Sequence, residues 1–188
     1  MTQKFTHAGD LIDQLEGYFL NTRSDPTAME SLSNAAHMLQ TAAAATAAGA
    51  HAPLVAAALL HDIGHWLDPD TTLAHLPKAD ARHEDVGAAH LAPFFDAAVC
   101  QPVQLHVAAK RYLCAAEPSY FAQLSPASVH SLNLQGGAMT PEEMSAFEAI
   151  PEHKDAVALR RWDEYGKNPD LEVPEFSHYR QLLLSLAN

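Results

Sequence analysis

Residues 58–67, with the sequence ALLHDIGHWL, set three polar side chains into an otherwise apolar helical pattern. His61, Asp62 and His65 can each bind a metal ion, through an imidazole nitrogen or a carboxylate oxygen. Adjacent residues of a helix point about 100° apart, so His61 and Asp62 can share one cation only at the edge of their helix. The motif therefore predicts a metal site whose other ligands come from elsewhere in the chain.

Further candidate ligands lie on or beside apolar helical stripes in other parts of the sequence: His37, His83, His106 and Asp163. With His61 and Asp62 they make a set of six. A lone helical histidine is more often a surface residue or a hydrogen-bonded core residue, and the 12 histidines of the chain weaken any single choice. We make no claim for the others and expect them on the surface or in packing: His7, His51, His75, His90, His130, His153 and His178.

The elements that must position these residues are predicted to be helices throughout. Alternating β-branched runs of strand length are absent from the sequence, and almost every segment has helical periodicity. The predicted fold class is therefore all-α, as a compact helical bundle. Helices are expected near residues 10–20, 29–48, 83–91, 99–114, 126–135, 152–165 and 175–187. One more is expected to start near Pro53 and to end with the motif at 58–67, and another to start at residues 140–143.

Several helix ends have clear local signals. Gly49 follows the second predicted helix, and Pro53 stands near the start of the third, where a missing N–H costs little. Residues 140–143, with the sequence TPEE, have the form of a capping box, with a hydroxyl at the N-cap and a carboxylate three residues later.

Length and composition indicate one folded domain. The chain has 188 residues, of which 48% are hydrophobic and 18% charged, and no low-complexity tract predicts disorder. The formal net charge of -12 argues against nucleic acid as a partner. A small anionic substrate remains possible, because a few local cations outweigh a distant field that is screened beyond roughly 10 Å.

The sequence favours a cytoplasmic location. Its first residues do not resemble a signal peptide, and the most apolar window, residues 42–60, is interrupted by polar residues, glycine and proline, so a membrane span is not expected. Two cysteines, Cys100 and Cys114, are too few for a disulfide framework and are expected as buried thiols. No obligatory protein partner is evident.

The order His37, His61-Asp62 and Asp163 resembles the H…HD…D signature of the HD-domain superfamily, all-helical metalloproteins that are mostly phosphohydrolases. Much of the chain also resembles a narrower group, the HD-domain mixed-valent diiron oxygenases that cleave organophosphonates. The resemblance implies one HD domain over residues 1–188, with a core at about 29–187 and an N-terminal helix and lid loop at 8–30. The motifs that carry it are HDIGH (61–65), HVAAKRYL (106–113), LSPAS (124–128), LQGGAMT (134–140) and RRWDEYGK (160–167).

This resemblance implies two iron ions, Fe²⁺/Fe³⁺, bridged by Asp62. One iron would also be bound by His37, His61 and Asp163, and the other by His83 and His106. Mixed imidazole and carboxylate ligands suit redox-active iron, and the second iron would keep open positions for a chelating substrate and for O₂.

The resemblance also implies a phosphonate site beside the metals. Lys110 stands one helical turn after His106, Arg160 one turn before Asp163, and His65 one turn after His61, so their side chains are expected near the metals. Asp62, His65 and Lys110 are the candidate catalytic residues, and the substrate contacts would be Glu30, His65, Lys110, Ser128, Gln135 and Arg160. Lys110 and Arg160 could instead be surface charges, Ser128 an ordinary helix residue and Gln135 part of a helix stop.

The chain departs from the family pattern in the lid. Family members carry a tyrosine and, three residues later, a glutamate, and the tyrosine binds the second iron until substrate displaces it. Glu30 stands at the glutamate position, but Thr27 occupies the tyrosine position, and Tyr18 is the nearest tyrosine upstream. The lid is therefore either threaded differently or closed without a tyrosine ligand.

The function that the resemblance implies is an iron-dependent oxygenase that uses O₂ to cleave the C–P bond of a small α-hydroxyphosphonate, giving phosphate and a carboxylic acid. A 1-hydroxy-2-amino- or 1-hydroxy-2-trimethylammonio-ethylphosphonate is the favoured substrate, since the acidic chain suits a cationic tail. Two alternatives stay open: an HD-type metal-dependent phosphohydrolase of a small phosphate ester or nucleotide, and a non-catalytic module that senses a phosphorylated ligand.

Overall fold

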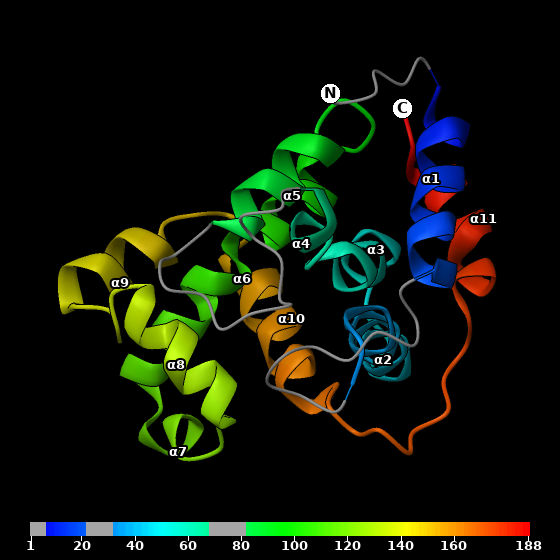
Figure 1. Ribbon diagram of the computed structural model, residues 1–188. Helices are drawn as coiled ribbons and strands as arrows, with labels where there is room; N and C mark the ends of the chain where they lie inside the picture. Colours follow the sequence, from blue (N-terminus) through cyan, green and yellow to red (C-terminus); the bar gives the residue numbers. More distant parts are fainter. Residues whose placement is uncertain (1–6, 22–31, 68–81) are drawn as a thin grey trace.

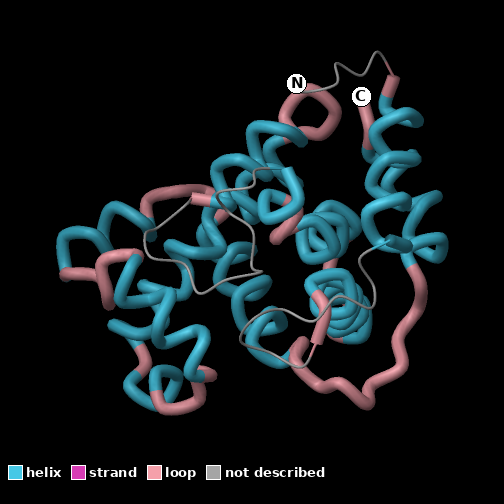
Figure 2. The backbone as a smooth tube through the Cα atoms, viewed as in Figure 1, coloured by secondary structure: helices cyan, strands magenta, loops and turns pink. Residues whose placement is uncertain are grey.

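The computed structural model describes residues 7–21, 32–67 and 82–188 (Figure 1). These residues form helices joined by loops, with no strand among them apart from isolated bridges such as that between Phe95 and Ala187 (Figure 2). The all-α prediction is confirmed. Glu30, Thr27 and the predicted lid loop between residues 22 and 31 lie outside the described residues, as does the connection at 68–81.

Most of the described helices match the predicted segments within a few residues. In order they are α1 (Ala8–Asn21), α2 (Asn34–Ala47), α3 (Ala52–Leu60), α4 (Gly64–Leu67), α5 (His83–Leu91), α6 (Ala97–Ala116), α7 (Pro118–Phe121), α8 (Pro126–Leu134), α9 (Pro141–Glu148), α10 (His153–Tyr165) and α11 (Phe176–Leu186).

The predicted start of the second helix is wrong. Leu32 and Ser33 are not helical, and α2 begins at Asn34. The Ser33 side chain accepts a hydrogen bond of 3.1 Å from the backbone N–H of Ala36. A serine in this position satisfies a free N–H of the first turn, so Ser33 starts the helix instead of continuing one that began earlier.

The metal motif does not continue the third helix as predicted. Helix α3 ends at Leu60, residues 61–63 form a turn, and α4 starts at Gly64. A Cβ atom on Gly64 would lie 2.0 Å from the backbone oxygen of His83, so only glycine lets α4 approach the start of α5 this closely. The sequence pattern predicted neither α4 as a separate helix nor the short α7.

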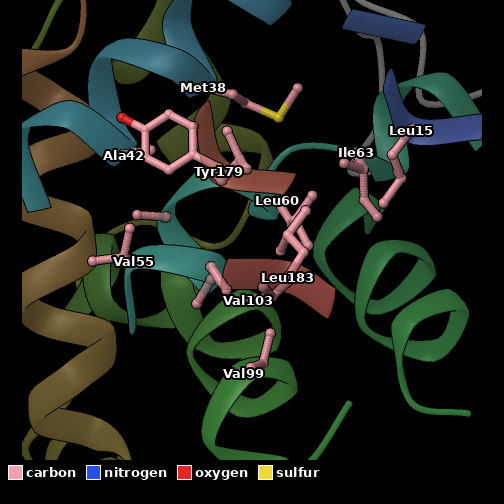
Figure 3. Packing of buried hydrophobic residues seen from close by; sticks show 14 of the residues in the cluster. Leu15, Met38, Ala42, Val55, Leu60, Ile63, Val99, Val103, Tyr179 and Leu183 are labelled. Atoms are coloured by element: carbon pink, nitrogen blue, oxygen red, sulfur yellow. The ribbon is translucent and has the colours of Figure 1, made fainter. Parts of the chain in front are cut away.

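The hydrophobic core surrounds α3. Every residue of this helix from Leu54 to Leu60 is buried, and a helix that is apolar on all sides occupies the centre of a fold. Figure 3 shows side chains from α2, α3, α6 and α11 facing one another in this core, among them Met38, Val55, Val103 and Leu183. The end of α3, which carries the metal motif, therefore lies inside the molecule.

Helices α6 and α10 carry two further candidate ligands, His106 and Asp163, and both helices contact α3. They pack against each other, α10 also contacts α2 and α3, and α6 also contacts α3 and α5. Helices α7, α8 and α9 gather at one end of the molecule, away from α1 and α11, which pack together at the other end (Figure 1).

Two smaller predictions concern the cysteines and the membrane. Both cysteines are free thiols, as the sequence predicts, but only Cys100 is buried, and Cys114 is half-buried. Among the residues described here, no helix has both the length and the apolar character that crossing a bilayer requires. The cytoplasmic location stays a prediction.

Candidate metal centre

The six candidate ligands converge on the end of α3. His61 caps α3 and Asp62 follows it in the turn, while His37 comes from α2 and His106 from α6. His83 is the first residue of α5, and Asp163 lies in the last turns of α10. His37, His61, His106 and Asp163 are buried, and the other two are half-buried.

Asp62 stands between two groups of ligand atoms, one on each side of its carboxylate. Its Oδ2 atom lies 3.6 Å from Nε2 of His61 and 3.9 Å from Nε2 of His37. Its Oδ1 atom lies 3.2 Å from Nε2 of His83 and 3.5 Å from Nε2 of His106. The two oxygens of one carboxylate thus face two different histidine pairs, which is the arrangement of a bridging ligand.

In each histidine pair, the two Nε2 atoms face each other. The Nε2 atoms of His37 and His61 are 3.2 Å apart, and those of His83 and His106 are 3.1 Å apart. Asp163 joins the first pair, with Oδ1 at 3.2 Å from Nε2 of His37. Each side of Asp62 therefore gathers enough nitrogen and oxygen atoms to hold one metal ion.

Backbone carbonyls determine which ring nitrogens can bind a metal. Nδ1 of His37 lies 2.7 Å from the oxygen of Gly166, Nδ1 of His61 lies 2.9 Å from that of Ala58, and Nδ1 of His106 lies 2.7 Å from that of Val103. A carbonyl only accepts, so Nδ1 must donate the proton, which leaves a lone pair on Nε2 of each neutral ring. Lone pairs facing each other at these distances repel unless a cation lies between them, so the donor set fits bound metal.

The protonation states also suit a metal centre. Burial lowers the pKa of His61 to about 4, and burial together with the charge of His65 lowers the pKa of His83 to about 3. Burial alone would raise the pKa of Asp62, but the charge of His61 and the hydrogen bonds with His106 and His83 outweigh it and hold the pKa well below its usual range. Two other rings shift in the opposite direction: burial alone would lower the pKa of His37 and His106, but interactions with Asp163 and Asp62 outweigh it and raise both. Neutral imidazole and ionised carboxylate are the forms that bind metals, so a bound metal would displace a proton from these two rings.

Lys110, predicted to lie near the metals, interacts electrostatically with the candidate ligands Asp163 and Asp62. Its side chain is buried, and its Nζ atom donates a hydrogen bond of 2.7 Å to Oγ of Ser131. Burial, followed by repulsion from Arg160 and Lys167, lowers the pKa of Lys110 to about 7. A buried ammonium group of this kind is not the solvated surface charge of the alternative interpretation.

Arg160 is buried as well, and each of its three guanidinium nitrogens donates a hydrogen bond. Its Nε atom donates to the hydroxyl of Tyr120 at 2.7 Å, and its two terminal nitrogens donate to the carboxylates of Asp163 and Glu164. It therefore connects the candidate metal ligand Asp163 to a group of polar residues further from the metals.

The remaining predicted residues have different surroundings. The ring of His65 stacks on that of His83, with centroids 4.0 Å apart, and the buried Ser128 lies 3.0 Å from Nζ of Lys167. Gln135 caps the end of α8, and its buried side-chain oxygen has no hydrogen-bond partner within the described part of the chain. Glu30 lies outside the described residues.

Sequence reasoning missed four residues of this polar group: Tyr120, Ser131, Glu164 and Lys167. Helical spacing could have found Glu164, since it stands four residues after Arg160 and both belong to the RRWDEYGK motif. Tyr120 lies on α7, a helix of one turn with no periodic pattern, so no signal in the sequence pointed to it.

Comparison with known proteins adds a family and three relatives. A family model described as the HD domain matches residues 34–149. A 1-hydroxy-2-(trimethylamino)ethylphosphonate dioxygenase of Leisingera caerulea, described as glycine-betaine-forming, is 40% identical over 96% of this chain and 92% of its own. A hydroxymethylphosphonate dioxygenase of Gimesia maris is 48% identical over 80% of this chain and 75% of its own. An uncharacterized protein of Acanthamoeba polyphaga mimivirus is 31% identical over 82% of this chain and 72% of its own.

Proposed function

The chain belongs to the HD-domain family of phosphonate oxygenases, and from this premise we propose its reaction and the residues that perform it. The enzyme takes a small α-hydroxyphosphonate and one molecule of O₂, cleaves the C–P bond, and releases inorganic phosphate and a carboxylic acid. The carbon that carried the hydroxyl group becomes the carboxyl carbon. All atoms of substrate and O₂ are accounted for in these two products.

The observation that carries this proposal is the position of Asp62 between two histidine pairs. We propose that two iron ions are held there, one by His37, His61, Asp62 and Asp163, and the other by Asp62, His83 and His106. Bound iron would supply the redox chemistry that lets the enzyme use O₂. The side with three protein ligands has fewer donors than the other, which leaves room for substrate.

The phosphonate is bound by groups of the protein itself. Lys110 and Arg160 offer an ammonium and a guanidinium group in a buried site, where a dianion is attracted far more strongly than at the surface. Ser128 lies beside these groups, with its hydroxyl oxygen 3.0 Å from Nζ of Lys167, and the ring of His65 stacks on that of His83. Held in this way, the carbon to be oxidised is oriented toward the metals and water is kept from the reacting atoms.

The substrate's tail is a separate question from its reacting group. One relative is named for a trimethylamino compound and another for hydroxymethylphosphonate, which has no tail. Both compounds share the hydroxyl and the phosphonate, for which the described site provides partners. Glu30, one of the predicted substrate contacts, lies outside the described residues. The proposed substrate is therefore the α-hydroxyphosphonate class, and the experiment below determines the tail.

The test uses iron-loaded protein and three substrates: hydroxymethylphosphonate and the 2-amino and 2-trimethylammonio forms of 1-hydroxyethylphosphonate. Phosphate release and O₂ consumption are measured together, with and without air. We expect one phosphate for each O₂ with at least one substrate, and no phosphate without O₂. Phosphate release that continues without O₂, or from simple phosphate esters, would instead identify a hydrolase.

A further inference from the structure

We propose that Glu164 is the positioning residue of the anion pocket, which we define as Lys110, Arg160 and Ser128. It neither binds metal nor touches substrate, and it acts by holding Arg160 and Ser128 in place. The inference rests on the proposed function, because the pocket has this role only if the substrate is a phosphonate.

Both carboxylate oxygens of Glu164 are bonded within the protein. Oε2 accepts hydrogen bonds from a terminal nitrogen of Arg160 and from the hydroxyl of Ser128, the latter at 3.3 Å. Oε1 accepts from the backbone N–H of Ser125 at 3.2 Å and lies 3.6 Å from Nζ of Lys167. Glu164 is therefore the one described side chain that contacts two of the three pocket residues through a single carboxylate.

The bonding of Arg160 explains why this contact matters for binding. A guanidinium group has five N–H donors in a fixed plane. Three are used, by Tyr120, Asp163 and Glu164, which leaves one N–H on each terminal nitrogen for a phosphonate oxygen. Asp163 is also a candidate metal ligand, so the metal centre would determine its position. The orientation of the Arg160 guanidinium plane therefore depends on the other two partners, Glu164 and Tyr120.

Glu164 also joins two elements that would otherwise separate. Ser125 is the N-cap of α8, and Ser128 lies in its first turn, whereas Arg160 and Glu164 belong to α10. Lys167 lies 3.0 Å from the hydroxyl of Ser128, and Lys110 is repelled by the charges of both Arg160 and Lys167, so these three cationic side chains are close together. The carboxylate of Glu164 offsets their repulsion and keeps the Ser128 hydroxyl beside Arg160.

The position of Glu164 on its helix separates it from the reaction. It follows Asp163 directly, and neighbouring residues of a helix point about 100° apart. Asp163 faces His37, while Glu164 faces the start of α8. A substitution at Glu164 should therefore disturb anion binding while leaving the metal ligands in place.

The experiment compares wild-type protein, E164Q and E164D, all loaded with iron. Calorimetry under anaerobic conditions measures the Kd of methylphosphonate, a dianion without the hydroxyl group, and steady-state assays measure KM and kcat for hydroxymethylphosphonate. E16Q is the matched control, because Glu16 is also paired with an arginine, Arg180, but lies between α1 and α11.

In E164Q an amide NH₂ replaces one acceptor oxygen and meets a donor. A hydrogen bond to a charged group is worth about 1.5 to 3 kcal/mol, so we expect Kd and KM to rise about 10-fold to 100-fold. We expect kcat to change by less than about threefold, because no contact at the metals is altered. Iron content and Tm should match wild type, E164D should recover part of the affinity, and E16Q should behave as wild type.

Three results would overturn the proposal: Kd and KM of E164Q at wild-type values, a fall in iron content or Tm that accounts for the lost affinity, or no binding of methylphosphonate to the wild type. Failure of the proposed function looks different. In that case no hydroxyphosphonate is turned over by wild-type protein, yet methylphosphonate still binds and binds more weakly to E164Q.

Discussion

Asp62 is the residue on which the two halves of the candidate metal centre depend. Each of its oxygens lies near a different histidine pair, at 3.2 Å from His83 on one side and 3.6 Å from His61 on the other. Without this shared negative charge, two cations so close together would repel each other with little compensation. In the proposed assignment its neighbour His61 would hold one metal only, so the two positions of the motif would differ in role.

Replacing Asp62 with asparagine should reduce the iron bound from two ions per chain to one or fewer, because the amide has one neutral oxygen in place of two charged ones. Iron released by acid and measured with a chromogenic chelator tests this. D155N is the control, since Asp155 pairs with His51 at 3.0 Å on the surface. An Asp62 variant that keeps both irons would contradict the ligand assignment.

Lys110 should make activity depend on pH. Its pKa is lowered to about 7 by burial and by the charges of Arg160 and Lys167, so the ammonium form is present below about pH 7 and is lost as the pH rises through that value. A dianionic substrate needs the charged form, and kcat/KM should therefore fall above about pH 7. A pH profile of kcat/KM measures this.

The matched variants for that profile are K110M and K154M. K110M should lose about 10-fold to 100-fold in kcat/KM at pH 6, as expected for removal of a charged donor, and should lack the alkaline fall. K154M changes an exposed lysine and should keep the wild-type profile. If the alkaline fall persists unchanged in K110M, another group causes it.

At the scale of the elements, the break between α3 and α4 brings the metal motif and α5 together. The turn after Leu60 directs Asp62 toward His83, and Gly64 lets α4 lie against the backbone of His83. The close packing of α4 against α5 therefore depends on Gly64, which has no side chain.

G64A should displace the start of α5, because the added Cβ atom would lie 2.0 Å from the backbone oxygen of His83. We expect a loss of about 1 to 3 kcal/mol in the free energy of unfolding, typical of overpacking, and loss of the iron bound by His83 and His106. G17A is the control, since nothing lies within 4 Å of a Cβ at Gly17, and it should be neutral or stabilising. Chemical denaturation and iron analysis measure both effects. Wild-type stability in G64A would show that α4 and α5 can separate at no cost.

For the whole molecule, the candidate ligands come from α2, α5, α6, α10 and the turn after α3, so bound metal would tie the interior of the bundle together. We also propose that the chain unfolds as a single domain. A ligand present at 100 times its Kd stabilises the folded state by about 2.7 kcal/mol.

Removing the metal with a chelator should therefore lower Tm by about 5 to 10 °C, with one transition before and after. Differential scanning calorimetry of the loaded and stripped protein tests this, and readdition of Fe²⁺ should restore the higher Tm. The D62N variant serves as control and should lose most of the difference. Equal Tm values with and without metal would contradict the view that the site connects the helices.

The amino-acid sequence by itself determined the local features of this protein. Helix ends at Gly49 and Thr140 follow from turn and capping chemistry, which acts between residues close together in the chain. The candidate ligands could be named because histidine and aspartate stood where an apolar stripe favours leucine. The start of α2 after Ser33 and the turn after Leu60 were harder to predict from the sequence. When only periodicity is considered, a serine cap and a close approach through Gly64 resemble an uninterrupted helix.

Only the tertiary structure decided how these residues face one another. The division of the Asp62 oxygens between two histidine pairs, the carbonyl of Gly166 that orients His37, and the contact of Glu164 with Ser125 all join segments far apart in sequence. Such contacts depend on how α10 packs against α2 and α6, and packing is a property of whole surfaces. No spacing within one helix contains that information, so the residue types were predictable and the atoms that meet were not.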